Sequence, residues 1–137
     1  FLRRSSDLER ELQERTDRLQ EAQRVAGVGS WEWDASTDTV TWSEETYRIF
    51  GWDTSTSTSP TFDDWIEAVH PEDREKAGKM VEEAMETGSF PTFEHRIQHP
   101  DGTIKWVECR GDVTQVDNRT TRITGTVLNI TERRESR

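Results

Sequence analysis

The sequence predicts an α+β fold: a five-stranded antiparallel sheet with helices on one face, preceded by a separate amphipathic helix. Three observations support this prediction. Runs of alternating aromatic or β-branched residues occur twice near residues 31–42 and three times between residues 91 and 130. Helix-forming segments separate the two groups of runs, and turn residues such as "PDG" join neighbouring strands. This order of strands and helices favours antiparallel pairing with the helices on one side.

The composition limits which partners we expect. The chain carries 18 basic and 28 acidic residues, a net charge of −10, so nucleic acids and anionic membrane surfaces would repel it. No apolar run approaches the about 20 residues of a membrane span, and the single cysteine, Cys109, cannot form an internal disulfide. We therefore expect a cytoplasmic domain with no nucleic-acid partner and no direct membrane contact.

Two features concern the origin of the chain. Its 137 residues begin with Phe1 and end in the middle of a pattern, so we expect a piece of a longer protein with one hydrophobic core. Lysine is limited to Lys76, Lys79 and Lys105, while acidic residues are abundant. Such a surface suits solubility at high internal salt, so we expect a halophilic source.

Residues 1–25 favour a helix. From Ser6 to about Arg24 almost every residue is a helix former, and apolar residues recur at heptad spacing. The a and d positions hold Leu8, Leu12, Leu19, Ala22 and Ala26. Two interpretations remain open: a coiled-coil linker that pairs two copies of the chain, or an amphipathic helix that lies on its own domain. The first predicts a homodimer.

Residues 26–131 are expected to form the domain. The glycines of "VAGVGS" end the first helix, and "WEWD" followed by "TDTVTWS" predicts a hairpin. The segment "EETYRIFGW" predicts a short helix that ends at Gly51. A polar loop over residues 53–61 then leads to "FDDWIEAV", which predicts one or two helical turns.

The clearest helix is "HPEDREKAGKMVEEAMETG". Pro71 suits its first position and Gly88 the position after its end. Gly78 inside the helix costs about 1 kcal/mol relative to alanine, which suggests a close contact there. Three strand-like runs follow, "PTFEHRIQ", "TIKWVECRGDV" and "RITGTVLNI", and residues 132–137 then predict the start of a further helix.

Five motifs at these positions carry a family resemblance. "GSWEWD", "WSEETYRIFGW", "VHPEDR", "HPDGTIKWVE" and "GTVLNITERR", in this order, resemble a PAS domain of the subgroup with Trp-rich first strands, found in prokaryotic sensor histidine kinases and signal transducers. The resemblance covers about residues 26–134. It implies a small pocket between the sheet and the helices, a role in sensing or dimerisation, and no enzymatic activity within the domain.

The same resemblance implies which side chains face the pocket. We expect Gly111 and Gly125 to leave room for a ligand beside the sheet. The implied pocket residues are Trp31, Trp33, Phe50, Met80, Val81, Phe93, His95, Ile97, Val107, Cys109, Ile123, Gly125 and Val127. Such a lining favours a small apolar or aromatic ligand, with His95 as the polar group. Two alternatives stay open: the tryptophans fill the space as ordinary core, and His95 is a core histidine bonded to a backbone carbonyl.

The cofactor of such a domain is unknown from the sequence, and two known ones fit poorly. Flavin-binding members carry a reactive cysteine before the long helix, where this chain has none, and their amide side chains are replaced here by Ile97, Val107 and Val127. Haem-binding members place a histidine inside that helix, whereas His70 precedes it and is expected to cap it. The remaining histidines and Cys109 lack metal-ligand spacing.

The end of the chain is expected to transmit the signal. The implied relay residues are Asn129, Ile130, Thr131 and Arg133. The family usually has aspartate where Asn129 stands, so we expect capping without a salt bridge from position 129 to Arg133. Three functions compete: a ligand-sensing input domain, a ligand-free dimerisation spacer, and a redox switch at Cys109. The last is the weakest, because an apolar interior disfavours the thiolate.

Overall fold

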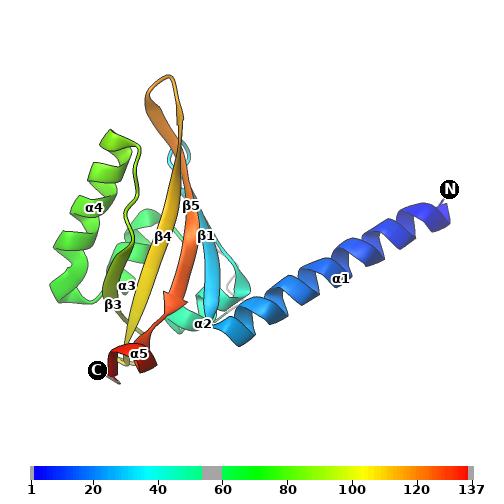
Figure 1. Cartoon of the computed structure of the whole chain (residues 1–137), viewed down its shortest axis with the longest axis horizontal. Helices are drawn as coiled ribbons and strands as arrows, with labels where there is room; N and C mark the ends of the chain where they lie inside the picture. Colours follow the sequence, from blue (N-terminus) through cyan, green and yellow to red (C-terminus); the bar gives the residue numbers. More distant parts are fainter. Residues whose placement is uncertain (1, 54–59, 136–137) are drawn as a thin grey trace.

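The computed structural model describes residues 2–53 and 60–135, with side chains from residue 5 onward, and forms one five-stranded antiparallel sheet. The strand order is β2-β1-β5-β4-β3, so the first hairpin joins the last three strands where β1 pairs with β5 (Figure 1). This arrangement confirms the predicted fold class. The strands are β1 (Val28–Asp34), β2 (Thr39–Trp42), β3 (Phe93–Gln98), β4 (Ile104–Val116) and β5 (Arg119–Asn129).

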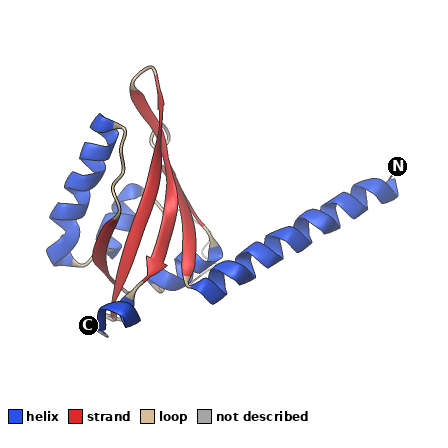
Figure 2. Ribbon diagram, in the orientation of Figure 1, coloured by secondary structure: helices blue, strands red, loops and turns tan. Residues whose placement is uncertain are grey.

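The helices take different positions around this sheet. The α3 and α4 helices cover one face, whereas α1 extends away on the other side and contacts the rest at β1 and α2 (Figure 1, Figure 2). The short α5 helix lies at the foot of the sheet. The helices are α1 (Leu2–Ala26), α2 (Glu44–Phe50), α3 (Phe62–Ala68), the 3-10 turn η1 (Pro71–Asp73), α4 (Arg74–Thr87) and α5 (Thr131–Glu135).

The ends of the short helices are fixed by local signals in the sequence. Gly51 and Gly88 follow α2 and α4 with φ of 74°, a left-handed conformation that glycine adopts without strain. Thr61 precedes α3 and exchanges hydrogen bonds with Asp64, each side chain accepting the other's backbone N–H. This capping box starts the helix at Phe62.

The space around two glycines, Gly78 and Gly29, differs from what the sequence predicted. The expected close contact at Gly78 is wrong, because a Cβ there would meet no atom within 4 Å. The tight contact lies instead at Gly29, where a Cβ would come within 2.1 Å of Thr46 Oγ1. Gly29 therefore lets α2 approach β1 closely, and Gly78 only weakens α4.

The β4–β5 hairpin is longer than the sequence patterns indicated. The strands continue to Val116 and begin again at Arg119, so only Asp117 and Asn118 form the turn. Both turn residues have positive φ, 54° and 62°, as in the two-residue turns whose twist matches that of the flanking strands. The polar residues of this segment thus extend the strands rather than form a broad loop.

Some expectations lie outside the described residues. These are residues 54–59 of the polar loop and residues 136–137 of the exiting helix. Within the described chain, α1 is a continuous helix that includes the predicted Ser6 to Arg24 segment. None of the helices described within residues 2–53 and 60–135 is both long and apolar enough to cross a membrane.

Candidate functional site

A small cavity lies between the inner face of the sheet and helices α2, α3 and α4. Its volume is about 60 Å³, compared with about 150 Å³ for an engineered cavity that binds benzene or xenon. The wall consists of Trp31, Trp33, Val40, Trp42, Thr46, Phe50, Phe62, Trp65, Val81, Phe90, Cys109, Ile123 and Val127. An apolar cavity of this size holds a molecule of a few non-hydrogen atoms, and a larger ligand would have to displace side chains.

Trp31 fills the space beside the two glycines in the middle of the sheet. It lies opposite Gly125 on β5, which in turn lies opposite Gly111 on β4. A Cβ at residue 125 would come within 2.7 Å of Trp31 Cζ2, and one at residue 111 within 3.1 Å of the Phe90 ring. The Trp31 and Phe90 ring centroids are 5.6 Å apart. Aromatic rings therefore occupy the room that the glycines were expected to leave for a ligand.

The indole N–H of Trp31 is buried without a hydrogen-bond partner. It is the one such side-chain nitrogen or oxygen in residues 5–53 and 60–135. A buried donor left without a partner costs about 1–3 kcal/mol of stability. The neighbouring Trp33 does not bear this cost, because its Nε1 donates to Asp38 Oδ1 at 2.9 Å.

The rest of the wall contains pairs of neighbouring aromatic rings. The Trp42 and Phe50 rings stack with centroids 4.7 Å apart, and the Phe62 ring lies 5.4 Å from Trp33 and 5.6 Å from Trp65. Such ring pairs contribute about 0.5–1.5 kcal/mol each beyond their buried area. The wall is thus aromatic and apolar on most sides.

His95 and Cys109 form a closed polar pair beside the cavity. His95 Nδ1 lies 3.1 Å from the carbonyl oxygen of Arg96, which only accepts hydrogen bonds, so Nδ1 carries the proton. Nε2 then accepts the thiol hydrogen of Cys109, whose Sγ is 3.4 Å away. Burial lowers the pKa of His95 and raises the pKa of Cys109 to about 12. His95 is therefore a neutral core histidine bonded to a backbone carbonyl, and the thiolate of Cys109 is disfavoured.

The cavity wall includes only part of the expected pocket. The expected residues in the wall are Trp31, Trp33, Phe50, Val81, Cys109, Ile123 and Val127. Others lie elsewhere in the core: Met80, Ile97 and Val107 are buried outside the wall, and the Phe93 ring stacks on His95 with centroids 5.3 Å apart. Gly125 supports Trp31 from the sheet instead of facing open space.

Several wall residues were missed by the sequence analysis. They are Val40, Trp42, Thr46, Phe62, Trp65 and Phe90. Alternation in β2, whose buried residues are Val40 and Trp42, could have found two of them. Phe62 and Trp65 share one face of α3 by their spacing of three, but which face meets the sheet is a tertiary property.

The end of β5 is tied to β4 by hydrogen bonds. Asn129 Oδ1 accepts the Thr131 backbone N–H at 3.1 Å and the Thr131 hydroxyl at 2.7 Å. Thr131 Oγ1 accepts the backbone N–H of Trp106 at 3.0 Å, and Ile130 donates its N–H to the Trp106 carbonyl at 2.9 Å. Asn129 thus caps α5 as expected, and the buried Ile130 and Thr131 hold the helix start on β4.

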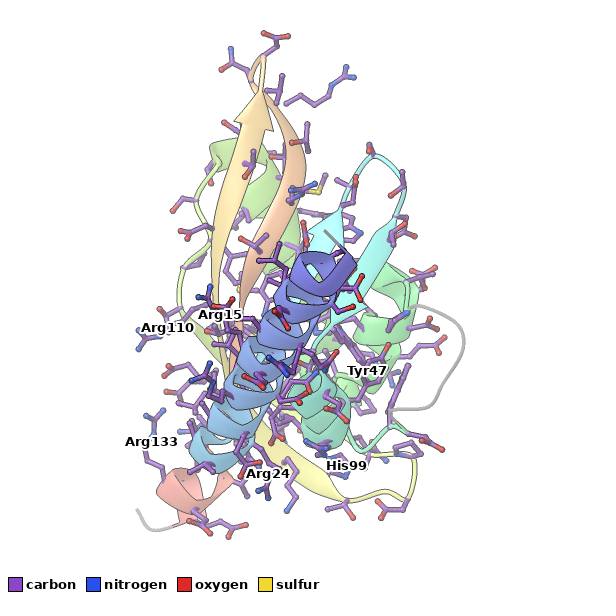
Figure 3. All side chains as sticks on the ribbon, turned by 90° about the vertical axis from the view of Figure 1, so that its right-hand side faces the viewer. Arg15, Arg24, Tyr47, His99, Arg110 and Arg133 are labelled. Atoms are coloured by element: carbon purple, nitrogen blue, oxygen red, sulfur yellow. The ribbon has the colours of Figure 1, made fainter. Side chains whose placement is uncertain are left out.

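Arg133 pairs with two glutamates of the sheet. Its guanidinium lies 3.3 Å from Glu94 and 3.2 Å from Glu108, at the foot of the sheet (Figure 3). Burial of Glu108 would raise its pKa, but hydrogen bonds from Arg133 and Arg110 outweigh this and keep the pKa below its usual value. The carboxylates that pair with Arg133 therefore belong to β3 and β4, and the uncharged Asn129 contributes no charge to this ion pair.

A second arginine contact connects α5 with the start of α4. The Trp106 ring contacts two guanidinium groups, with Arg134 3.7 Å and Arg96 5.6 Å from its ring centroid. Arg96 also binds the Asp73 carboxylate at 2.8 Å and Glu72 at 3.0 Å. Hydrogen bonding from Arg96 lowers the pKa of Asp73. A continuous set of contacts thus joins η1, β3, β4 and α5.

A family model described as "PAS fold" matches residues 39–127 of the chain. The chain is 33% identical over 127 residues to a blue-light-activated histidine kinase of Brucella anthropi, covering 92% of this chain and 25% of that protein. It is 26% identical over 131 residues to the probable diguanylate cyclase DgcE of Escherichia coli, covering 96% of this chain and 11% of that protein. The chain therefore spans about a quarter or less of these relatives.

Solved structures share the fold. A sensory box histidine kinase/response regulator from Burkholderia thailandensis superposes with a TM-score of 0.72 at 22% identity, covering 87% of this chain and 88% of that one. A domain of a putative light and redox sensing histidine kinase from Haloarcula marismortui gives a TM-score of 0.67 at 23% identity, covering 84% and 99%. At these identities the likeness concerns the fold alone.

Proposed function

This chain belongs to the PAS fold family, and we propose that it is the ligand-sensing input domain of a larger signal-transduction protein, such as a sensor histidine kinase. The domain is sensory and not catalytic, while the relatives that contain similar segments are a histidine kinase and a probable diguanylate cyclase. In this proposal residues 1–25 form a linker, 26–131 the sensor and 132–137 the start of an output helix, in a cytoplasmic protein.

One observation carries the proposal: β5 runs directly from the cavity wall into the junction with α5. Ile123 and Val127 line the cavity, and Asn129 caps α5 two residues beyond Val127. Val127 is also paired with Cys109, a wall residue on β4. A ligand that moves these strands would therefore shift the start of the helix that leaves the domain.

The ligand class follows from the cavity. A wall of tryptophan, phenylalanine and aliphatic side chains favours a small apolar molecule, and the volume of about 60 Å³ leaves no room for an aromatic ligand unless side chains move. Flavin fits poorly, because Ile97, Val107 and Val127 are buried apolar side chains with no polar group to offer it. His70 accepts the Glu72 backbone N–H and caps η1, so it is not free to ligate haem.

Xenon titration followed by two-dimensional amide NMR tests the proposal, because xenon binds dry apolar cavities. We expect shifts at Ile123 and Val127 in the wall and at Thr131 to Glu135 in α5. The variant Val81→Leu should reduce the response by adding a methylene to the wall, while Val116→Leu on the exposed hairpin should not. Absence of any shift would contradict a ligand cavity, and shifts confined to the wall would contradict the relay.

A ligand-free dimerisation spacer is the second candidate, favoured by the surface of α1. Leu8, Leu12 and Leu19 are 57%, 63% and 66% exposed, at the heptad positions expected for a seam. We propose that this seam pairs two copies of the chain. Sedimentation of the variant Leu12→Asp with Leu19→Asp should show less dimer, with Glu9→Asp and Glu14→Asp as the control pair. An unchanged dimer fraction would exclude this seam.

A further inference from the structure

The α2 helix contacts both the cavity and α1. Its buried residues Thr46 and Phe50, which are four positions apart and share one face, belong to the cavity wall. The same helix meets the last turn of α1, where the charges of Arg24 and Glu45 attract each other. A change in the wall therefore has a short path to α1 through α2.

Three residues with hydroxyl groups fasten α2 to β1 beside the wall. Thr46 Oγ1 donates to the Ser30 carbonyl at 2.8 Å, and Ser43 Oγ accepts the Ser30 N–H at 2.9 Å. The two hydroxyl oxygens lie 3.1 Å apart, and because the Thr46 hydrogen is already used, Ser43 donates to Thr46. Gly29 permits this contact, since a Cβ there would overlap Thr46 Oγ1. A displacement of the wall at Thr46 is thus passed to Ser30.

Ser30 lies close to the point where α1 joins the sheet. The α1 helix ends at Ala26, and Gly27, with φ of 68°, leads the chain into β1. Gln23, in the last turn of α1, donates from Nε2 to Ser30 Oγ at 3.4 Å. The end of α1 is therefore held on β1 at the same residue that Thr46 holds from α2.

From these contacts we infer that α1 is a second relay of the cavity, and that the Thr46 hydroxyl couples this helix to the wall. This inference rests on the proposed function, because it concerns how occupation of the same cavity is transmitted. A ligand that displaces α2 shifts Ser30 and, with it, the last turn of α1, while β5 carries the change to α5. The domain then signals through both of its flanking helices.

The length of α1 would amplify such a shift. At about 1.5 Å per residue its 25 residues span about 37 Å, so a tilt of about 5° at its base moves the far end by about 3 Å. The exposed Leu8, Leu12 and Leu19 lie along this helix. Occupation of the cavity would therefore change how the α1 helices of two copies meet, which joins the two candidate functions in one mechanism.

Xenon titration of the whole chain, followed by two-dimensional amide NMR, tests this coupling. We expect saturating xenon to shift the amide resonances of residues 23–27 as well as those of α5. The quantity to compare is the ratio of the α1 shifts to the α5 shifts, because at saturation it does not depend on how tightly xenon binds. Thr46→Val keeps the size of the side chain and removes its hydroxyl. This variant should lower the ratio about 2- to 10-fold, the range that one neutral hydrogen bond contributes to an equilibrium.

Three further variants separate the hydroxyl from other effects. Thr46→Ser retains the hydroxyl and should restore the ratio. Thr41→Val removes an exposed hydroxyl of β2 outside the wall and should leave the ratio unchanged. Val81→Leu narrows the cavity, so both sets of shifts should shrink together. Thr46→Val itself should fold, because the Ser30 carbonyl still accepts the Ser43 N–H at 2.9 Å.

Gln23→Met gives an independent measurement from the side of α1. It removes the hydrogen bond to Ser30 without altering the wall, so it should also lower the ratio, and it decides the question if Thr46→Val does not fold. If xenon shifts α5 but not α1, or if the deciding variant leaves the ratio unchanged, the inference is wrong while the sensing function stands. If xenon shifts neither helix, the proposed function fails and the inference with it.

Discussion

The guanidinium of Arg134 lies 3.7 Å from the ring centroid of Trp106. The α5 helix therefore rests on β4, which pairs with the edge strand β3. The backbone of Trp106 also bonds Ile130 and Thr131. One residue of β4 therefore holds α5 through both its ring and its main chain. The direction of the exiting helix depends on the position of this part of β4.

Replacing Trp106 should release α5. Trp106→Leu removes the aromatic ring that the Arg96 and Arg134 guanidinium groups contact, and such cation–π contacts contribute about 0.5–1 kcal/mol at exposed sites. We expect amide exchange of Thr131–Glu135 to quicken several-fold. Val116→Ala at the far end of β4 is the control. Unchanged exchange in α5 would show that the main-chain bonds alone hold the helix.

The cap at the start of α5 should depend on the side-chain oxygen of residue 129. Asn129→Ala removes two hydrogen bonds from Thr131 and should lower the free energy of unfolding by about 1–2 kcal/mol in urea titrations. Asn129→Asp keeps an acceptor oxygen and should restore most of this stability. An equal loss of unfolding free energy in both variants would mean that the hydrogen bonds of residue 129 do not stabilise the start of α5.

Alanine substitution at two glycines should change the free energy of unfolding in opposite directions. Gly78→Ala should raise the free energy of unfolding by about 1 kcal/mol, since no atom lies within 4 Å of the added Cβ and alanine is the better helix former. Gly29→Ala should lower it by about 1–3 kcal/mol, because the added Cβ would lie 2.1 Å from Thr46 Oγ1. Thermal unfolding of both variants measures the contrast, and a loss of stability in Gly78→Ala would contradict it.

Stability should fall as the pH drops below about 6.5, the usual pKa of histidine. Burial lowers the pKa of His95 in the folded chain, so the unfolded state binds its proton first and is favoured in acid. The slope is at most about 1.4 kcal/mol per pH unit for one such group. Urea unfolding from pH 8 to pH 5.5 measures this slope, and His95→Leu should reduce it whatever its own stability. An unchanged slope would assign the effect to other groups.

Salt should stabilise the chain if its acidic surface is adapted to a halophilic cell. The net charge of −10 disfavours the compact state, and ions screen this repulsion. We expect the melting temperature to rise between about 0.1 M and about 1 M KCl, where the screening length shortens from about 10 Å to about 3 Å. Rising salt also weakens surface ion pairs, so a falling melting temperature would argue against this adaptation.

Local signals predicted the elements of this fold well. Gly51 and Gly88 act within one or two turns of chain, so their effect could be read from neighbouring residues. The hairpin of β1 and β2 likewise follows from alternation alone. Gly78 was misinterpreted because its cost is visible in the sequence, whereas the empty space beside it is not.

The cavity could be predicted only in part. The family resemblance implied that Cys109, Ile123 and Val127 face the interior, and the structure has all three in the cavity wall. The resemblance could not say how far along each strand the cavity extends, so Ile97 and Val107 were included although they pack outside the wall. The contribution of Phe62 and Trp65 depends on where α3 meets the sheet, which long-range packing decides.

The β4–β5 hairpin also offers an opportunity for measurement. Its two-residue turn, Asp117 and Asn118, projects beyond the other strands at the end of the sheet opposite α5 (Figure 1). Exposed turns of this kind tolerate inserted segments better than strands or helices do. A fluorescent group placed there would leave both ends of the chain free, so an intact signalling protein could carry an optical reporter on its sensor.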